Sequence, residues 1–482
     1  MLNIINTILK GHVSKIKMDA SKKQQQYDLM TKTPMTKLIL RLSAPTIVSM
    51  LVSSIYNMAD TFFVSQLGTS ASAAVGVVFP LTAILQAVGF TIGSGAGSRI
   101  SIYLGEEKSE EADKVASSAV FASVISGIIL ALLCKLFMAP ILRFVGATET
   151  ILPYAESYAD YILVGFPIMC ASFVMNHLLR CQGKTTLSMI GLSAGGILNI
   201  ILDPIFIFTF NMGIAGAAVA TILSQAVSLI LLLVFIMGKY SVMKIGVNKI
   251  SWKFDVYSVI IRIGAPSFFR QGLASIASSL LNNRAAVFGD SAVAAFSIVG
   301  KVSFIIMALM LGVGQGFQPV VGYNYGARNY NRVRSAYKVT MMIGCAMMTV
   351  AAIICFIFAP GIMALFRPDD PEVIKIGTFV LRLQSVVLPL MSVTVSTNML
   401  HQSLAKNKEA TFLALTRQGL YFIPLIIILP SLMGLFGIQI TQSISDVLSM
   451  LTAIPFAVRF FRIMKQEELE HENMSEVNSW NS

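Results

Sequence analysis

Four polar residues stand inside stretches of sequence that are otherwise apolar, and their side chains suit the binding of a small cation. Asp60 lies in the apolar run 38–67, and Asn199 and Asp203 lie four residues apart in the run GGILNIILDPIFIF. A spacing of four places two side chains on one face of a helix. Thr221, in the next apolar run, adds a hydroxyl group. A carboxylate inside a membrane helix costs about 2.5–3.5 kcal/mol, so a functional role is the default hypothesis for both acids.

If these helix faces meet, two carboxylates, an amide and a hydroxyl share one pocket. Oxygen ligands of this kind suit a hard cation such as Na⁺. Two carboxylates held close together also favour the uptake of a proton by one of them. We therefore predict that Asp60, Asn199, Asp203 and Thr221 bind a coupling ion, either Na⁺ or H⁺. The alternative is that the amide and the hydroxyl only join packed helices.

Two prolines lie on the same apolar runs as these polar residues. Pro45 interrupts the first run, and Pro204 directly follows Asp203. Proline cannot donate a backbone hydrogen bond, so each is expected to bend its helix, and we predict a conformational hinge at both. The polar residues that we assign to a substrate cavity are Gln225, Asn282 and Asn283.

The composition places these runs in a membrane. Of the 482 residues, 55% are hydrophobic and only 12% are charged, whereas soluble proteins carry about 25% charged residues. The runs are continuously apolar, which predicts helices and not the alternating strands of a barrel. No nucleophile, metal motif or Walker motif stands out, so we expect neither an enzyme nor a cofactor. The glycine runs 93–97 and 312–316 lie inside apolar segments, which favours helix packing over phosphate binding.

About twelve membrane helices can be counted, joined by short connections. The predicted spans are 38–67, 74–102, 115–138, 154–181, 187–210, 214–238, 259–288, 293–323, 337–360, 373–403, 410–432 and 436–461. They divide the chain into an N-terminal tail (1–36), a first six-helix lobe (37–238), a linker (239–258), a second six-helix lobe (259–462) and a C-terminal tail (463–482).

The positive charge of the chain predicts its orientation. The net charge is +12, and the lysines and arginines concentrate on alternate connections, including 239–253 and 328–338. Such a distribution places both termini and the linker in the cytoplasm of a plasma-membrane protein. In a soluble protein a net charge of +12 would favour nucleic-acid binding, but here the charge lies mainly in loops and tails on one side of a membrane protein, so we expect no nucleic-acid partner. The segment Met1–Met18 has an amphipathic pattern, which indicates either a helix on the membrane surface or a solvated tail.

The two halves of the sequence repeat each other at a distance of 221 residues. Ala44-Pro45 falls on Ala265-Pro266, Gly68 falls on Gly289, and Gly105 falls on Gly326. A repeat of six helices starts both halves on the same side of the membrane, which predicts two lobes with a cavity between them.

The second half lacks the acids of the first. Asp60 corresponds to Leu281 and Asp203 corresponds to Leu425, so Asp446 is the one candidate intramembrane acid of the second lobe. We therefore expect ion coupling to belong to the first lobe.

The sequence resembles the multidrug and toxic compound extrusion (MATE) family, and its MepA-like bacterial branch in particular. The resemblance rests on the first-helix pattern AP…YNMADTFFVSQLG, the N…LDP motif that ends at Pro204 and the duplicated glycines. The resemblance covers about residues 34–462. It implies an all-α, V-shaped transporter that exports lipophilic, often cationic compounds in exchange for Na⁺ or H⁺. Matched residue by residue, it implies a cation site at Asp60, Asn199, Asp203 and Thr221, and it matches Pro45 to a proline linked to bending of the first helix.

Two other functions remain open at this stage. A lipid-linked precursor flippase on a related fold would need a cationic cavity, and several basic residues fall in or beside apolar segments. These residues are Arg99, Arg180, Arg270, Arg284 and Lys301. A receptor without transport activity would explain neither the buried acids nor the repeat. Under the transporter hypothesis the partners are small-molecule drugs or toxic metabolites and the lipid bilayer, and the protein acts as a monomer.

Overall fold

The computed structural model describes residues 20–238 and 240–480, which form helices joined by short connections, with no strand among them. Helices are expected here because a segment in lipid must satisfy its backbone hydrogen bonds internally. The amphipathic pattern of Met1–Met18 lies outside the described residues.

Each half of the chain contributes a series of long helices. The helices of the first half are α2 (Met35–Ser65), α3 (Thr69–Gly105), α4 (Ser109–Leu136), α5 (Met138–Val145), α6 (Leu152–Cys181), α7 (Thr185–Pro204), the π-helical turn η1 (Ile205–Thr209) and α8 (Gly213–Met237). After the 3-10 turn η2 (Val247–Lys249), the second half contains α9 (Phe254–Ala286), α10 (Asp290–Gly326), α11 (Tyr330–Phe366), α12 (Pro371–Val387), the 3-10 turn η3 (Leu388–Leu390), α13 (Met391–Ser403), α14 (Asn407–Leu415), the π-helical turn η4 (Thr416–Phe422), α15 (Ile423–Met433) and α16 (Leu435–Trp480).

In the described part of the chain, eleven helical segments are long and apolar enough to cross a membrane. α9 has 33 residues but carries Arg262, Arg270 and Gln271, and it is not among the eleven. Together with α9, these segments account for the twelve predicted spans. The spans predicted at 373–403 and 410–432 are each interrupted by a turn, η3 and η4 respectively.

The backbone conformation of the two halves follows the same repeat as the sequence. Gly68 and Gly289 precede corresponding helices with φ angles of +109° and +97°. Gly213 and Gly434, again 221 residues apart, have φ angles of +55° and +61°. Glycine adopts these left-handed conformations at little cost, so the duplication is preserved where the turns require it.

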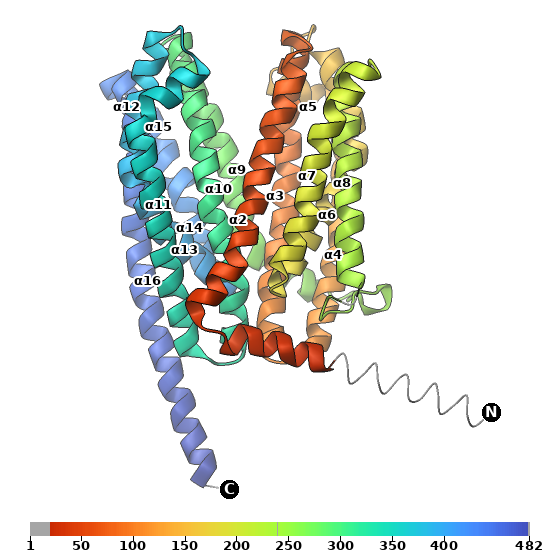
Figure 1. Ribbon diagram of the computed structural model, residues 1–482, viewed down its shortest axis with the longest axis vertical. Helices are drawn as coiled ribbons and strands as arrows, with labels where there is room; N and C mark the ends of the chain where they lie inside the picture. The colour runs from red at the N-terminus through yellow and green to blue at the C-terminus, as the bar shows by residue number, and fades with distance from the viewer. Residues whose placement is uncertain (1–19, 239, 481–482) are drawn as a thin grey trace, which may run out of the picture.

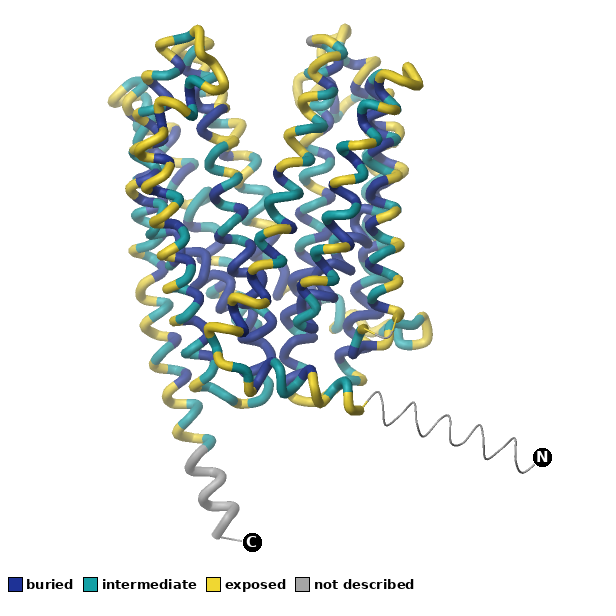
Figure 2. Tube along the Cα trace, in the orientation of Figure 1, coloured by how far each residue is buried: buried dark blue, intermediate teal, exposed yellow. Residues whose placement is uncertain are grey.

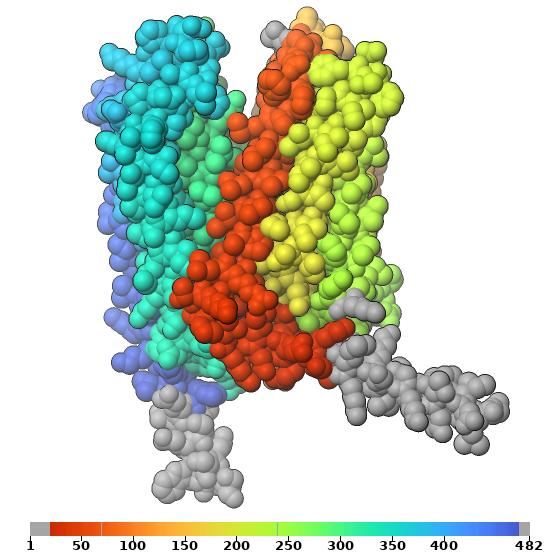
Figure 3. Space-filling view, in the orientation of Figure 1, coloured from red at the N-terminus to blue at the C-terminus, as the bar shows by residue number. Residues whose placement is uncertain are grey.

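The helices form two groups that approach each other at one end and spread apart toward the other (Figure 1). We call α2–α8 the first lobe and α9–α16 the second lobe. The closed end is the one that also carries helix 20–32 and the C-terminal end of α16, and the open end lies opposite. Buried residues concentrate between the lobes near the closed end (Figure 2), and a hollow separates the lobes at the open end (Figure 3).

Helices cross between the lobes at the closed end. α2 packs against α10, and Thr46 Oγ1 donates a hydrogen bond to the carbonyl oxygen of Gly312 at 2.6 Å. α3 packs against α9, and the hydroxyls of Ser94 and Ser267 are 2.9 Å apart. The amide nitrogen of Gln402 donates to both hydroxyls, at 3.1 and 3.0 Å. A layer of small polar residues therefore joins the lobes.

Glycines make these crossings close. A Cβ atom on Gly264 of α9 would lie 1.9 Å from the carbonyl oxygen of Thr91, and one on Gly95 of α3 would lie 2.0 Å from that of Ile260. No side chain fits at such a distance, so the two backbones touch only because both residues are glycine. The prediction that the glycine runs serve helix packing is confirmed.

The second half of the predicted N-terminal tail is a docked helix. Residues 20–32 are helical and lie along the closed end (Figure 1), with Met30 fully buried. Gln26 packs against Gly183 of the first lobe, while Asn324 of the second lobe donates to the carbonyl oxygen of Met30 at 3.0 Å. The helix therefore contacts both lobes.

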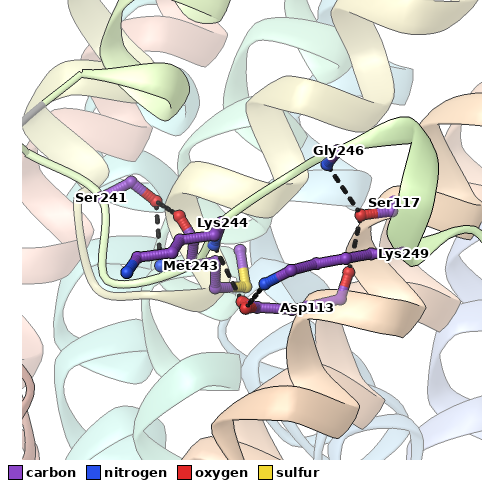
Figure 4. A network of polar contacts seen from close by, with 7 residues as sticks. All are labelled: Asp113, Ser117, Ser241, Met243, Lys244, Gly246 and Lys249. Atoms are coloured by element: carbon purple, nitrogen blue, oxygen red, sulfur yellow. Dashed lines mark hydrogen bonds and ion pairs between the residues drawn. The ribbon is translucent and has the colours of Figure 1, made fainter.

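The linker between the lobes is held against α4 of the first lobe (Figure 4). Asp113 is buried and accepts a hydrogen bond from the backbone nitrogen of Lys244 at 2.8 Å, and it forms an ion pair with Lys249. The hydroxyl of Ser117, one turn further along α4, accepts from the backbone nitrogen of Gly246 at 3.3 Å. These contacts fix the path of the chain between the two lobes.

The substitution Asp113→Ala should release the linker. It removes two charge-assisted contacts, each worth about 1.5–3 kcal/mol, so trypsin should cleave after Lys244 or Lys249 about tenfold faster or more. Glu111→Ala on the same helix is the matched control, because Glu111 pairs with Lys114 and is about half exposed, at 47% of its side chain. Equal digestion of the two variants, followed by gel electrophoresis, would show that Asp113 does not anchor the linker.

Candidate functional site

α7 lies between α2 and α8, and two glycines let both neighbours come close. A Cβ atom on Gly196 would lie 3.0 Å from the ring of Tyr56 on α2. One on Gly195 would lie 2.9 Å from the carbonyl oxygen of Ser224 on α8. Asn199 follows one turn later, so it lies where three helices of the first lobe meet.

Three of the four residues predicted to bind the ion are joined by hydrogen bonds. The amide nitrogen of Asn199 donates to Asp203 Oδ1 at 3.0 Å and lies 3.3 Å from Thr221 Oγ1. Asp203 is fully buried, and Asn199 is 2% exposed. The spacing of four along α7 therefore produces a direct contact, and α8 contributes the hydroxyl.

Asp60 lies on α2 one turn after Tyr56, whose ring packs against Gly196 of α7. Asp60 is half-buried, although its Oδ1 is enclosed. Its charge reaches Asp203, and the charges of both acids reach the hydroxyl of Tyr158 on α6. Tyr158 is buried, at 6% exposure. Reasoning from the sequence missed this tyrosine, because one aromatic residue in an apolar segment carries no spacing signal.

The pocket has buried acceptor oxygens that lack a donor. Among the described residues, Asp60 Oδ1, Asn199 Oδ1 and Asp203 Oδ2 have no hydrogen-bond partner. None of the ion pairs in the same part of the chain includes either acid. Leaving a buried polar group unpaired costs about 1–3 kcal/mol, and more if it is charged. A proton taken up by one of the carboxylates, or a small cation held by these oxygens, would reduce this cost.

The chain changes its helical form directly after the acid of α7. α7 ends at Pro204, and residues Ile205–Thr209 form the π-helical turn η1, in which the backbone nitrogen of Phe210 donates to the carbonyl oxygen of Ile205 at 2.9 Å. π-turns inside helices occur frequently at functional sites. The role of Pro204 as a hinge stays a prediction.

Pro45 lies within α2, which continues without interruption from Met35 to Ser65. The carbonyl oxygen of Pro45 accepts a hydrogen bond from Ser49 Oγ at 3.0 Å. Asp60 follows fifteen residues later, about 22 Å along the helix axis. One helix therefore connects the closed-end crossing with the acid pocket.

The residues assigned to a substrate cavity do not share one environment. Gln225 is buried in the first lobe at 6% exposure, and its amide oxygen is unpaired in the described part of the chain. Asn282 and Asn283 are exposed near the C-terminal end of α9 in the second lobe. Gln225 is enclosed in the first lobe and the two asparagines are exposed on the second, so a cavity lined by all three stays a prediction.

The acid of the second lobe has a different environment. Asp446 on α16 is buried at 4% exposure, and its Oδ1 accepts from Arg417 Nε at 2.7 Å and from the amide of Gln442 at 2.8 Å. Its charge is therefore compensated by an arginine, in contrast to Asp60 and Asp203. The sequence did not point to this partner, because 29 residues separate Arg417 from Asp446.

Breaking this ion pair should destabilise the second lobe. Arg417→Gln leaves a buried, uncompensated carboxylate, which costs about 3–5 kcal/mol, so the melting temperature of the purified protein should fall. Arg459→Gln, at an exposed position of α16, should leave it unchanged. Adding Asp446→Asn to Arg417→Gln should recover most of the loss, and a double variant no more stable than the single one would contradict this account.

A family model named MatE matches residues 45–205 and again residues 266–428, once in each lobe. The chain therefore belongs to the MatE family of membrane transporters, and it is a transporter and not an enzyme.

Individual relatives match nearly the whole chain. The multidrug export protein MepA of Staphylococcus aureus (strain MSSA476) is 28% identical over 433 residues, which cover 90% of this chain and 95% of MepA. A crystal structure of a MATE protein in complex with MaL6 has a TM-score of 0.87 at 28% identity, and it covers 91% of this chain and 99% of the other. An outward-facing multidrug resistance MATE transporter has a TM-score of 0.84 at 28% identity, with 91% and 98% covered.

Proposed function

We propose that this protein is a secondary active antiporter that exports lipophilic or cationic compounds in exchange for H⁺ or Na⁺. The observation that carries the proposal is the acid pocket of the first lobe, in which three buried oxygens lack a partner. The corresponding position on the second lobe, Leu425, is apolar, and Asp446 is neutralised by Arg417. The relative MepA is named as a multidrug export protein, which supports the export of several compounds.

The coupling follows from the geometry of α2. Protonation of Asp60 or Asp203, or binding of Na⁺ between them, removes the repulsion between the two carboxylates. α2 carries Asp60, and its other end donates the hydrogen bond from Thr46 to Gly312 of α10. A shift of α2 at the pocket therefore reaches the contact between the lobes. Ion and exported compound are coupled because they stabilise different conformations of the two lobes.

Orientation and location complete the proposal. The closed end carries the linker, helix 20–32 and the C-terminal end of α16. The lysines and arginines of these segments favour a cytoplasmic position for this end under the positive-inside rule. The hollow between the lobes then opens to the outside of the plasma membrane, as in the relative described as outward-facing. The pocket offers only oxygen ligands, which suit either ion, and the protein acts as a monomer on small molecules without a nucleic acid or a cofactor.

Efflux from proteoliposomes tests this function. A fluorescent lipophilic cation is loaded, and a pH gradient and a Na⁺ gradient are imposed in separate experiments. We expect one of the two gradients to drive efflux faster than in protein-free liposomes. An ionophore that collapses this gradient should abolish the efflux. Efflux that neither gradient changes would overturn the proposal.

A further inference from the structure

Two arginines, one buried and one half-buried, lie near the contact between the lobes. Arg180 on α6 is 3% exposed, and its Nη1 donates to the amide oxygen of Gln315 on α10 of the other lobe. Arg270 on α9 is partly exposed and donates from Nη1 to Asn398 Oδ1 at 3.2 Å. His177, one turn before Arg180, packs against Gly93 of α3. The next residue of α3, Ser94, is bonded to Ser267, which accepts from Arg270 Nη2 at 3.3 Å. Side chains from both lobes therefore bring two guanidinium groups and an imidazole to the same stretch of α3.

These positive charges have no counter-charge. Among the described residues no ion pair includes either arginine, and the polar partners of both are uncharged. On the helices that carry the two arginines, α6 and α9, the acids lie far along the chain. On the same helices the nearest are Asp160, twenty residues before Arg180, and Asp255, fifteen residues before Arg270, about 30 and 22 Å along the axis. A buried charge without a charged partner costs several kcal/mol, so the fold maintains the buried Arg180 at a cost.

The site also has free donors and an aromatic wall. In the described part of the chain Arg180 Nη2 and His177 Nε2 have no hydrogen-bond partner, although both side chains are more than nine-tenths buried. The ring of Phe90 packs edge-on against His177 with centroids 5.2 Å apart, and it stacks on Phe173 at 5.5 Å. Guanidinium groups bind carboxylates and phosphates through paired N–H donors. The apolar rings beside them suit the hydrocarbon part of the same ligand.

We propose that Arg180 and Arg270, with His177 beside both, bind the carboxylate or phosphate group of an amphiphilic small molecule. The inference rests on the proposed transport function in that such a molecule belongs to the exported compounds. The exported compounds would then include acidic amphiphiles, which bind between the lobes, in addition to lipophilic and cationic compounds. The site is separate from the acid pocket, which lies on α2, α7 and α8.

Binding to the purified full-length protein tests the inference without any gradient. Benzoate, benzamide and inorganic phosphate are titrated at constant ionic strength, and the shift in melting temperature gives the apparent affinity. Benzoate should bind, whereas benzamide, which has the same shape without the charge, should not. Arg270→Gln should weaken benzoate binding about tenfold or more, because a charge-assisted hydrogen bond is lost. Arg262→Gln, two turns earlier on the same helix and exposed, should bind benzoate as the unmodified protein does.

The outcomes separate this inference from the proposed function. Equal binding of benzoate and benzamide, or unchanged benzoate binding in Arg270→Gln, would overturn it. Tighter binding of phosphate than of benzoate would also overturn it, since the aromatic wall would then contribute nothing. Arg270→Lys keeps the charge and should retain part of the affinity. Gradient-driven efflux of a lipophilic cation in Arg270→Gln reports on the antiporter alone, so each proposal can fail without the other.

Discussion

The substitution Asp203→Asn should abolish gradient-driven efflux in proteoliposomes while leaving the protein folded. The asparagine keeps the size of the side chain and still accepts the hydrogen bond from Asn199, but it can neither bind a proton nor compensate a cation. Removal of the charge takes away the difference between the ion-bound and ion-free states. The imposed gradient can then no longer shift the equilibrium between the conformations. Efflux should therefore fall at least about tenfold, toward the level of protein-free liposomes.

Asp60→Asn should give the same loss, because both acids belong to one pocket. Asp255→Asn is the matched control, as it makes the same chemical change at an exposed position near the start of α9. Retention of wild-type rates by both pocket variants would remove the pocket from the mechanism. A loss in Asp255→Asn as large as in the pocket variants would show that the assay reports a general effect of charge.

The substitution Gly264→Ala should drive the lobes apart at the closed end. The added methyl group would lie 1.9 Å from the carbonyl oxygen of Thr91, and a backbone atom of a packed helix cannot rotate away. Overpacking of this kind costs about 1–3 kcal/mol, enough to shift a two-state equilibrium about tenfold or more. The conformation in which the lobes meet at the closed end should therefore lose population.

Labelling of a buried reporter measures this shift. Ser43 on α2 is 2% exposed and packs against Gly316 of α10, so Ser43→Cys should react with a maleimide only when the lobes separate. The exposed Cys345 is replaced by serine in this background. Gly272→Ala is the control, because a Cβ atom there meets nothing within 4 Å. Equal labelling of the Gly264→Ala and Gly272→Ala proteins would mean that the glycine crossing does not hold the closed end together.

The sequence predicted the features that depend on local spacing or on repetition. The distance of four between Asn199 and Asp203 was enough to place both on one face of α7. The offset of 221 residues between the halves predicted two lobes, and the paired positive φ angles of Gly68 and Gly289 follow the same repeat. The glycine runs were predicted to pack helices because their apolar surroundings exclude a phosphate site.

The features that the sequence could not provide depend on contacts between distant segments. Arg417 and Asp446 meet only because α16 packs on the turn η4, and Arg180 reaches Gln315 across the lobes. Helix 20–32 was predicted as part of a tail, since its docking depends on a hydrogen bond from Asn324 to a backbone carbonyl. A backbone acceptor leaves no mark in a sequence. Which oxygens of the acid pocket lack a partner could likewise be known only from the structure.

The reverse flux tests the central claim most directly, because coupling between two ligands is reciprocal. Proteoliposomes carry an outward gradient of the exported compound and no ion gradient, and H⁺ or Na⁺ entry is recorded. Efflux of the compound should drive one of the two ions inward, and Asp203→Asn should abolish this entry. Rapid efflux of the compound with no movement of either ion, or ion entry that survives in Asp203→Asn, would contradict it.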